Sequence, residues 1–252
     1  MNNQNTIEKM KQMRLSGMAD MHYTNTTSNI NMEYTIDQYV AMLVDQEWEN
    51  RENRKIKSLI KNARFRYPAT IQDIDYTANR QLDKNTYERL ALLDFIRSNE
   101  NIIITGSTGT GKSYLAQALG NQACLMLMKT YYYNTARLID HLKLARLEGT
   151  YTKLLINIEK VNLLILDDFG LAAFDNLSRQ ILMDIVESKY DRSSIIIASQ
   201  IPISGWHEII GEGTIADAIL DRIVHSSHRI QLKGESLRKR NSNRDENLNK
   251  KM

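Results

Sequence analysis

The sequence predicts an α/β protein in three layers, with helices on both faces of a parallel β-sheet. Five short runs rich in apolar or β-forming residues alternate with segments of helical periodicity. These runs cover residues 101–105, 130–134, 163–166, 195–198 and 229–232. Strands joined through helices run parallel, and the crossing helices cover both faces of the sheet. A glycine-rich segment follows the first run and two aspartates follow the third, at the sheet edge where ligands bind in such folds.

Helices are expected between these runs, over residues 112–128, 135–147, 178–190 and 215–224. Leu138, Leu142 and Ala145, for example, recur at the spacing of one helix face. Strands and helices together define an expected α/β domain over residues 69–240. The polar residues 241–252 are expected to form a disordered tail.

Residues 1–68 predict a small all-helical domain ahead of the sheet. A short first helix is expected to end near Gly17, and the polar stretch 24–29 then separates it from a longer helix. Apolar residues recur at helical spacing in that longer helix, and Pro68 ends the segment. We expect this domain to serve DNA or partner binding and oligomerisation.

The composition is typical of a soluble globular protein. Of the 252 residues, 42% are hydrophobic and 25% are charged. The N-terminus is polar and no run of about 18 apolar residues occurs, so the sequence predicts neither a signal peptide nor a membrane span. The single cysteine, Cys124, excludes an internal disulfide and suits a cytoplasmic location. The net charge of +3 is too small to indicate nucleic-acid binding by itself.

The glycine-rich segment predicts a phosphate-binding loop. From Gly106 to Ser113 it fits the pattern G-x-x-x-x-G-K-[ST] without a mismatch, between a strand and a helix, and a chance turn is the alternative. Backbone N–H groups and the helix N-terminus would hold phosphates, Lys112 would reach the β- and γ-phosphates, and Ser113 would ligate Mg²⁺. The predicted ATP contacts are Gly106, Ser107, Thr108, Gly109, Thr110, Gly111, Lys112, Ser113 and Tyr114.

Asp167 and Asp168 directly follow the third apolar run. A carboxylate at the end of such a strand can hold Mg²⁺, which we assign to Asp167. The next carboxylate can take a proton from the attacking water, which makes Asp168 the predicted general base. A turn that merely ends the strand is the alternative reading.

Three further polar residues are candidates for sensing the γ-phosphate. Gln200, after the fourth run, would orient the attacking water, with Ser199 as the second choice and an ordinary polar pair as the alternative. Arg222, near the end of a predicted helix, suits an arginine finger that reaches a neighbouring subunit, or else a surface ion pair. Arg238 is a weaker candidate for phosphate sensing.

Together these residues resemble the IstB-type helper ATPases of insertion-sequence transposition, relatives of the DnaC helicase loader and of DnaA. The matching motifs include Leu-Ser-Gly-Met-Ala at 15–19, Leu-Asp-Asp-Phe-Gly at 166–170, Ala-Ser-Gln at 198–200 and Ala-Asp-Ala-Ile-Leu-Asp-Arg at 216–222. The resemblance implies an AAA+ ATPase domain after a helical domain, ATP-dependent assembly on double-stranded DNA, and delivery of that DNA to a partner transposase. Only about twenty residues follow the fifth strand, so the AAA+ lid is expected to be reduced or absent.

A basic stretch, residues 51–66, predicts a DNA-binding surface. It holds seven basic residues against one acidic residue, Glu52. The basic residues are Arg51, Arg54, Lys55, Lys57, Lys61, Arg64 and Arg66. The solvated face of a helix is the plainer interpretation. Tyr131, Tyr132 and Tyr133 could stack on bases, but as a strand they are expected to pack in or beside the sheet.

The functional prediction is therefore an ATP-dependent, self-associating DNA-binding helper of transposition. A DnaC-like helicase loader that prefers single-stranded DNA shares the same ATP-site residues and stays open. A small-molecule kinase would need an acceptor pocket and an arginine-rich lid, neither of which is recognisable. A nucleotide-binding interaction protein without turnover is the remaining alternative.

Overall fold

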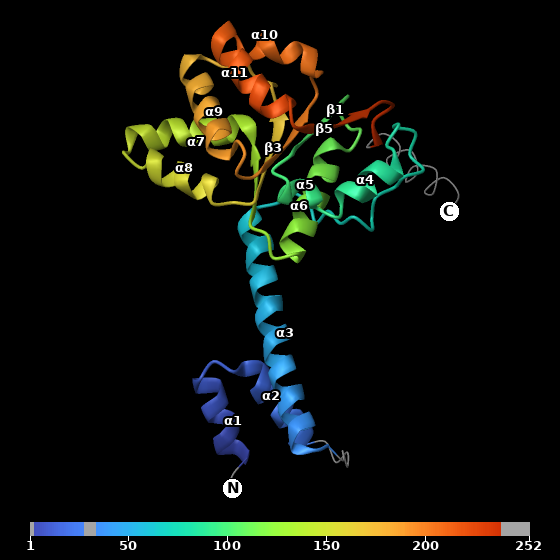
Figure 1. Cartoon of the computed structure of the whole chain (residues 1–252), viewed down its shortest axis with the longest axis vertical. Helices are drawn as coiled ribbons and strands as arrows, with labels where there is room; N and C mark the ends of the chain where they lie inside the picture. The colour runs from blue at the N-terminus through green and yellow to red at the C-terminus, as the bar shows by residue number, and fades with distance from the viewer. Residues whose placement is uncertain (1–2, 28–33, 238–252) are drawn as a thin grey trace, which may run out of the picture. The chain divides into compact units, whose positions relative to one another are not determined.

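The computed structural model describes residues 3–27 and 34–237, and the chain divides into two compact units, residues 1–58 (unit 1) and residues 59–252 (unit 2). Figure 1 shows the elements of both units. Arg238 and the predicted tail, residues 241–252, lie outside the described residues. How these units correspond to functional domains stays a prediction.

Unit 1 contains helices α1 (Asn3–Gln12) and α2 (Ser16–Thr27) and the larger part of α3 (Ile36–Ala63). Gly17 lies in the first turn of α2, whereas the sequence predicted it near the end of the first helix. It is a close-contact residue, because a Cβ there would lie 2.7 Å from the carbonyl oxygen of Gln46 on α3. The polar residues through Thr27 are helical, and threonine hydroxyls such as that of Thr24 bond to the carbonyl four residues earlier.

Glu47 of α3 is the polar centre of unit 1. The residue is 4% exposed, and its side chain accepts hydrogen bonds from the backbone N–H groups of Gly17 (2.7 Å) and Met18 (3.4 Å) at the start of α2. Arg51 Nε donates to the same carboxylate at 2.7 Å. Burial acts to raise the pKa of Glu47, but these hydrogen bonds outweigh it, so the pKa lies below its ordinary value. An anionic carboxylate at a helix N-terminus stabilises that helix.

We expect Glu47→Gln to destabilise unit 1 by about 1–3 kcal/mol, because two N–H groups of α2 lose their charged acceptor. The folded-state pKa is lowered, so the stabilisation is complete above the ordinary value of 4.5 and is lost as the pH falls through the folded-state value. Amide hydrogen exchange in α2 measures the effect at pH 7 and in acid. Glu49→Gln, at an exposed position of the same helix, is the control. Equal loss of protection in both variants would contradict the capping role.

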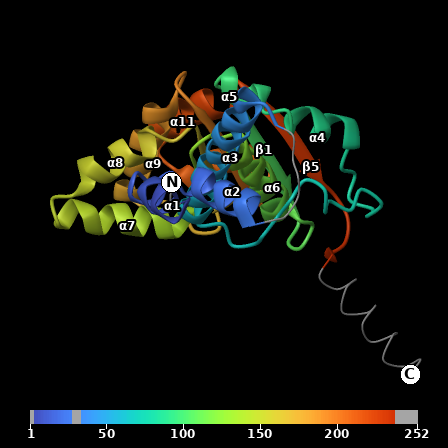
Figure 2. The same cartoon turned by 90° about the horizontal axis from the view of Figure 1, so that it is seen from below.

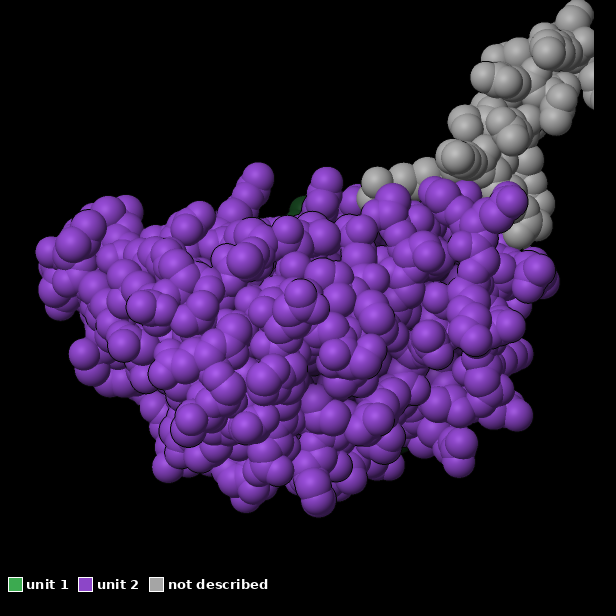
Figure 3. Space-filling view, turned by 90° about the horizontal axis from the view of Figure 1, so that it is seen from above, with its two compact units in different colours: residues 1–58 green, residues 59–252 purple. Residues whose placement is uncertain are grey.

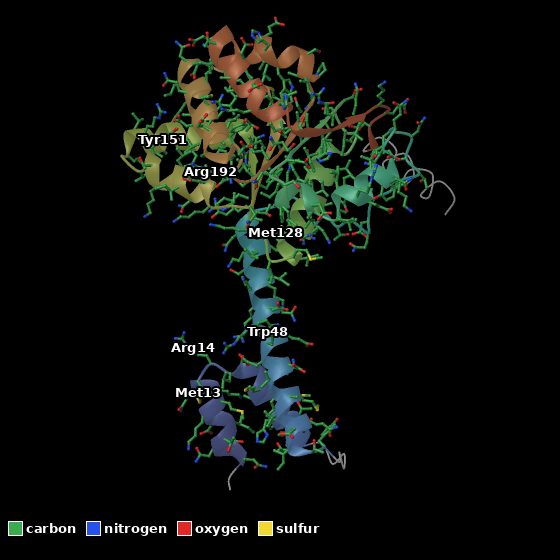
Figure 4. All side chains as sticks on the ribbon, viewed as in Figure 1. Met13, Arg14, Trp48, Met128, Tyr151 and Arg192 are labelled. Carbon is green, nitrogen blue, oxygen red and sulfur yellow. The ribbon has the colours of Figure 1, made fainter. Side chains whose placement is uncertain are left out.

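One face of α3 in unit 1 exposes apolar side chains at a spacing of four residues. Ile36 is 83% exposed, Val40 52%, Val44 47% and Trp48 65%. Figure 4 labels Trp48 on α3. Side chains four apart on a helix form one stripe, so unit 1 presents a continuous apolar surface there.

The described part of unit 2 is built on five strands: β1 (Asn101–Gly106), β2 (Thr130–Asn134), β3 (Leu163–Phe169), β4 (Ser194–Ser199) and β5 (Ser227–Leu232). Their order is β2-β3-β4-β1-β5, and every adjacent pair is parallel. The predicted five-stranded parallel sheet is confirmed. β1 lies between β4 and β5, so the loop after β1 follows an inner strand of the sheet.

Helices cover both faces of the sheet, which confirms the three layers (Figure 2). On one face Ile103, Leu164 and Ile197 belong to the same core as the helices of that side. These helices are α7 (Thr135–Leu147), α8 (Tyr151–Glu159), α9 (Asn176–Lys189), α10 (Trp206–Ile210, after a short 3₁₀ turn, η1, Ile203–Gly205) and α11 (Gly213–Val224). On the other face Ile104 and Ile196 pack with α4 (Lys84–Leu90), α5 (Asp94–Arg97) and α6 (Lys112–Leu125). Alternate residues of each strand thus serve opposite cores.

After β5 the described chain, Lys233 to Leu237, returns to the glycine-rich loop. The backbone N–H of Leu237 donates to the carbonyl of Gly109 (2.9 Å), and that of Lys233 donates to the carbonyl of Arg80 (3.0 Å). The short return segment therefore braces the loop after β1. Among the described residues, no helix has both the length and the apolar character of a membrane span.

Candidate functional site

The loop after β1 has the backbone geometry of a phosphate site. Gly109 and Gly111 adopt φ values of +80° and +95°, which only glycine reaches without strain. Gly111 is the N-cap of α6, so the helix begins at Lys112 with its first N–H groups at the loop. Lys112 is 7% exposed and its Nζ donates to the Ser107 carbonyl at 2.8 Å. The loop therefore combines backbone donors, a helix N-terminus and an ammonium group around one point.

Asp167 is fixed at the end of β3 by two hydroxyl groups. Ser113 Oγ donates to Asp167 Oδ1 at 2.9 Å, and Tyr132 Oη donates to Oδ2 at 2.7 Å. Asp167 is 1% exposed, and burial together with the bond to Asp167 raises the pKa of Tyr132, which stays a donor at neutral pH. A hydroxyl and a carboxylate side by side at a phosphate loop fit the oxygen ligands of Mg²⁺. Tyr132 was not predicted as a site residue.

Asp168 differs from Asp167 in its backbone conformation and in its surroundings. Its φ of +55° lies in the left-handed region, where aspartate is tolerated, and the pairing of β3 with β4 is irregular between Leu166 and Phe169. This turn places Asp168 in the wall of the large cavity beside the glycine-rich loop. Asn134 Nδ2 donates to Asp168 Oδ2 at 3.0 Å. Two successive carboxylates thus have different surroundings, one buried and fixed and one facing the cavity.

Gln200 also lines that cavity, and Thr108 Oγ1 of the loop donates to its Oε1 at 2.9 Å. Ser199 does not reach the cavity. It is fully buried, its hydroxyl donates to the Phe169 carbonyl (2.8 Å), and it accepts from the N–H of Ile201 (3.1 Å). Neighbouring strand residues point in opposite directions. The predicted nucleotide contact of Ser199 is therefore not supported, because its hydroxyl is hydrogen-bonded to the carbonyl of the last residue of β3.

Arg222 lies near the amino-terminal end of β1, whereas the glycine-rich loop follows the carboxyl-terminal end of that strand. Its carbonyl is 3.4 Å from Nδ2 of Asn101, the first residue of β1, whereas the loop follows the last residue of that strand. A strand of this length spans roughly 20 Å. The Arg222 Nε lies 2.8 Å from Glu187 Oε2 without hydrogen-bond geometry, and its guanidinium lies 5.6 Å from the ring centroid of Tyr190. Arg222 therefore cannot serve the site of its own chain.

The cavity beside the loop has a volume of about 700 Å³, within the range of small-ligand sites. All its lining residues belong to unit 2, which is purple in Figure 3. Its loop side is formed by Thr108, Gly109, Gly111, Lys112, Ser113, Asp168 and Gln200. The rest is formed by Arg66, Tyr67, Asp73, Ile74, Asp75, Arg80, Tyr114, Leu171 and Leu237. Arg80 was not predicted: it is 3% exposed, its Nη1 donates to the Thr110 carbonyl (3.2 Å), and burial lowers its pKa.

The seven basic residues of 51–66 are all exposed, but they are not equally available. Arg51 and Arg54 lie 2.7 and 3.6 Å from the carboxylate of Glu47. Arg66 lies over the Tyr67 ring, 5.4 Å from its centroid, at the ATP-site cavity. No ion pair within the described chain engages the other four, Lys55, Lys57, Lys61 and Arg64.

Comparisons of fold and sequence agree with this geometry. The fold is similar to that of DnaI, with a TM-score of 0.53 at 21% identity over 70% of this chain and 93% of that one. It is also similar to AMPPCP-bound DnaA from Aquifex aeolicus, with a TM-score of 0.54 at 20% identity over 69% of this chain and 53% of that one. These likenesses confirm the predicted AAA+ fold.

Sequence relatives come from insertion sequences. The insertion-sequence ATP-binding protein y4pL of Sinorhizobium fredii is 41% identical over 93% of this chain and 96% of its own length. The ATP-binding protein of the insertion sequence IS21 of Pseudomonas aeruginosa is 32% identical over 82% of this chain and 78% of its own. The family model described as IstB-like ATP binding protein matches residues 8–245. This chain therefore belongs to the family of IstB-like ATP-binding proteins.

Proposed function

We propose that this protein is an ATP-hydrolysing helper of transposition. It assembles with ATP on double-stranded target DNA and delivers that DNA to the transposase of the same element, in the cytoplasm. The observation that supports ATP hydrolysis is that two adjacent carboxylates have different surroundings. Asp167 is buried beside Ser113, and Asp168 lines the same cavity as Gln200.

The geometry supports the following roles. The loop N–H groups and Lys112 bind the β- and γ-phosphates, while Ser113 and Asp167 would hold Mg²⁺, which would neutralise charge on the phosphates. Asp168 accepts a proton from a water molecule oriented by Gln200. The water oxygen bonds to the γ-phosphorus, the bond to the β-phosphate oxygen breaks, and ADP leaves. Tyr132 keeps Asp167 in position through its 2.7 Å hydrogen bond.

The remainder of the cavity suits the nucleoside part of ATP. Ile74 and Leu237 supply apolar walls, and Tyr114 adds an aromatic ring. Arg80 contacts the loop by donating a hydrogen bond to the Thr110 carbonyl. The chain segment before the sheet and the return segment after β5 would therefore both contact the nucleotide, which links nucleotide binding to segments far apart in sequence.

Asn134 restrains the proposed base. A donor to a carboxylate occupies an oxygen that would otherwise accept the proton and holds the group in one orientation, and such bonds contribute about 1.5–3 kcal/mol. We expect Asn134→Ala to raise ATP turnover in the absence of DNA by about tenfold, equivalent to about 1.4 kcal/mol.

Asn134 also caps α7, since its Oδ1 accepts the N–H of Arg137 at 3.2 Å. Asn134→Ser keeps a capping oxygen and loses the amide donor, so it separates the two roles. Phosphate-release assays compare both variants with the unchanged protein. Basal turnover that is unchanged or lower in Asn134→Ser would show that Asn134 does not restrain Asp168.

DNA binding and assembly rest on two surface features. Lys55, Lys57, Lys61 and Arg64 are exposed cations without ion pairs in the described chain, as phosphate contacts require. The apolar stripe of α3, Ile36 to Trp48, is the kind of surface that buries against a subunit or partner.

The decisive experiment compares a long labelled duplex and a matching single strand, each with a non-hydrolysable ATP analogue, with ADP and without nucleotide. Tight, cooperative binding of the duplex only with the ATP analogue is the expected result. Preference for the single strand would favour a helicase loader, and absence of binding to both would remove the DNA function. Lys57→Gln and Lys61→Gln should reduce the salt dependence of duplex binding, whereas Lys153→Gln on α8 should not.

A further inference from the structure

A second cavity of about 190 Å³ lies at the edge strand β2, and it shares no lining residue with the ATP-site cavity. Residues of β2, α7, α8 and the end of α3 form it, all within unit 2. They are Asn62, Arg64, Tyr131, Tyr133, Leu138, His141, Leu142, Leu154, Asn157 and Ile158. The proposed ATPase mechanism uses none of them.

Two tyrosine rings form the strand side of this cavity. Tyr131 and Tyr133 lie on one face of β2 because Tyr132 between them points to the opposite core and to Asp167. Their centroids are 6.1 Å apart at an interplanar angle of 88°, and Lys129 Nζ lies 5.0 Å from the Tyr131 centroid. Both rings are half-buried. A planar, unsaturated group is the natural ligand of such rings.

The rim is polar and carries positive charge. Arg64, His141 and Asn157 are exposed and line the cavity above a buried floor that includes Leu138, Leu142 and Ile158. No carboxylate is among the lining residues. No ion pair within the described chain engages the Arg64 guanidinium. A cavity with aromatic walls, an apolar floor and an arginine at the rim suits a planar ring attached to an anion.

The chain geometry holds Arg64 at this rim. α3 ends at Ala63, and Arg64 adopts a φ of +59°, a left-handed position usually occupied by glycine. The next residue, Phe65, packs into the core on the other face of the sheet, where its ring lies 2.9 Å from the position a Cβ of Gly120 would take. The chain therefore straddles the edge of β2, with Arg64 on one face and Phe65 on the other.

We propose that this cavity binds one unstacked nucleotide of a DNA strand, with the base against Tyr131 and Tyr133 and a flanking phosphate on Arg64. This proposal rests on the proposed DNA-binding function. Stacking of a base on an aromatic side chain is worth about 1–3 kcal/mol and tolerates any base. A distorted or mismatched base pair costs least to open, so the cavity favours DNA that is already weakened.

The test uses the full chain with a non-hydrolysable ATP analogue and two duplexes that differ by one central mismatch. The unchanged protein is expected to bind the mismatched duplex about tenfold more tightly. Tyr131→Leu and Arg64→Gln should each abolish this preference. Tyr131→Phe, which keeps the ring, and Lys160→Gln, an exposed cation of the same unit outside the cavity, should retain it. Binding of the ATP analogue should be unaffected in all four variants.

Other results overturn the proposal in distinguishable ways. If the unchanged protein binds both duplexes equally and the variants do likewise, the cavity takes no base, while the DNA-binding function stands. If no duplex is bound at all, the proposed function falls first. Micromolar binding of deoxyadenosine or thymidine monophosphate that Tyr131→Leu removes would assign the cavity to a free nucleotide. Loss of transposase binding in Tyr131→Leu, with mismatch preference intact, would assign it to a protein side chain.

Discussion

Asp168→Asn is expected to lower ATP turnover strongly while ATP binding and ATP-dependent assembly persist. The amide has the same shape as the carboxylate and tolerates the φ of +55°, but it cannot accept a proton from water. General-base catalysis contributes about 10²–10⁴-fold, and turnover should fall by that factor. Single-turnover phosphate release measures the chemical step, and a fluorescent ATP analogue measures binding.

Asp191→Asn is the matched control, since Asp191 has nearly the same backbone conformation (φ of +54°), is exposed and does not line the ATP-site cavity. It should leave both readouts unchanged. Asp167→Asn should differ from Asp168→Asn, because the predicted Mg²⁺ ligand is lost and the dependence on magnesium concentration shifts. Normal hydrolysis by Asp168→Asn would mean that another group accepts the proton.

Local patterns in the sequence were sufficient to predict the strands and the phosphate loop. The run 130–134 and the helix 135–147 were predicted at the bounds that the structure has, because β-forming residues give way to helical periodicity at Asn134. The loop pattern predicts its own flanking elements. Helices α4, α5 and α10 were not predicted, because segments of four to seven residues depend on tertiary contacts more than on their own periodicity.

Contacts between neighbouring strands were the part that the sequence could not supply. Tyr132 and Asn134 reach the two aspartates only because β2 pairs with β3 in a register that sets Asn134 opposite Asp167. Strand order is not encoded in any single run of residues. Ser199 and Gln200 were adjacent candidates, and only the pleat at the end of β4 separates a buried hydroxyl from a cavity residue.

The number of basic residues in the stretch 51–66 also did not show which of them are available to bind DNA. Seven basic residues predicted a DNA surface, yet Arg51 and Arg54 lie beside Glu47, and the count could not reveal this pairing. Glu47 precedes the counted stretch and is buried against α2. The four unpaired cations are therefore the sharper prediction for DNA contact.

Arg222→Ala is expected to lower ATP turnover about 10³-fold or more in the assembled state and to leave the isolated subunit unchanged. The physical reason is distance. Arg222 lies near the amino-terminal end of β1 and its own glycine-rich loop follows the carboxyl-terminal end, so only another subunit's site is within its reach. Arg222→Lys keeps the charge but loses the planar fork and should recover little activity. Glu187→Gln removes the ion-pair partner of Arg222 without touching the arginine, and it should retain or raise assembled turnover.

Mixed assemblies decide whether the arginine acts between subunits. Lys112→Ala removes the loop ammonium and inactivates its own site, but it keeps Arg222. Arg222→Ala keeps a complete loop, but it offers no arginine to a neighbour. Each variant alone should be inactive, whereas a mixture assembled with ATP on DNA should regain turnover, because the intact loop of one subunit meets the intact arginine of the next. Failure of every mixing ratio to restore turnover, with assembly confirmed, would leave Arg222 the structural role that its contacts with Glu187 and Tyr190 describe.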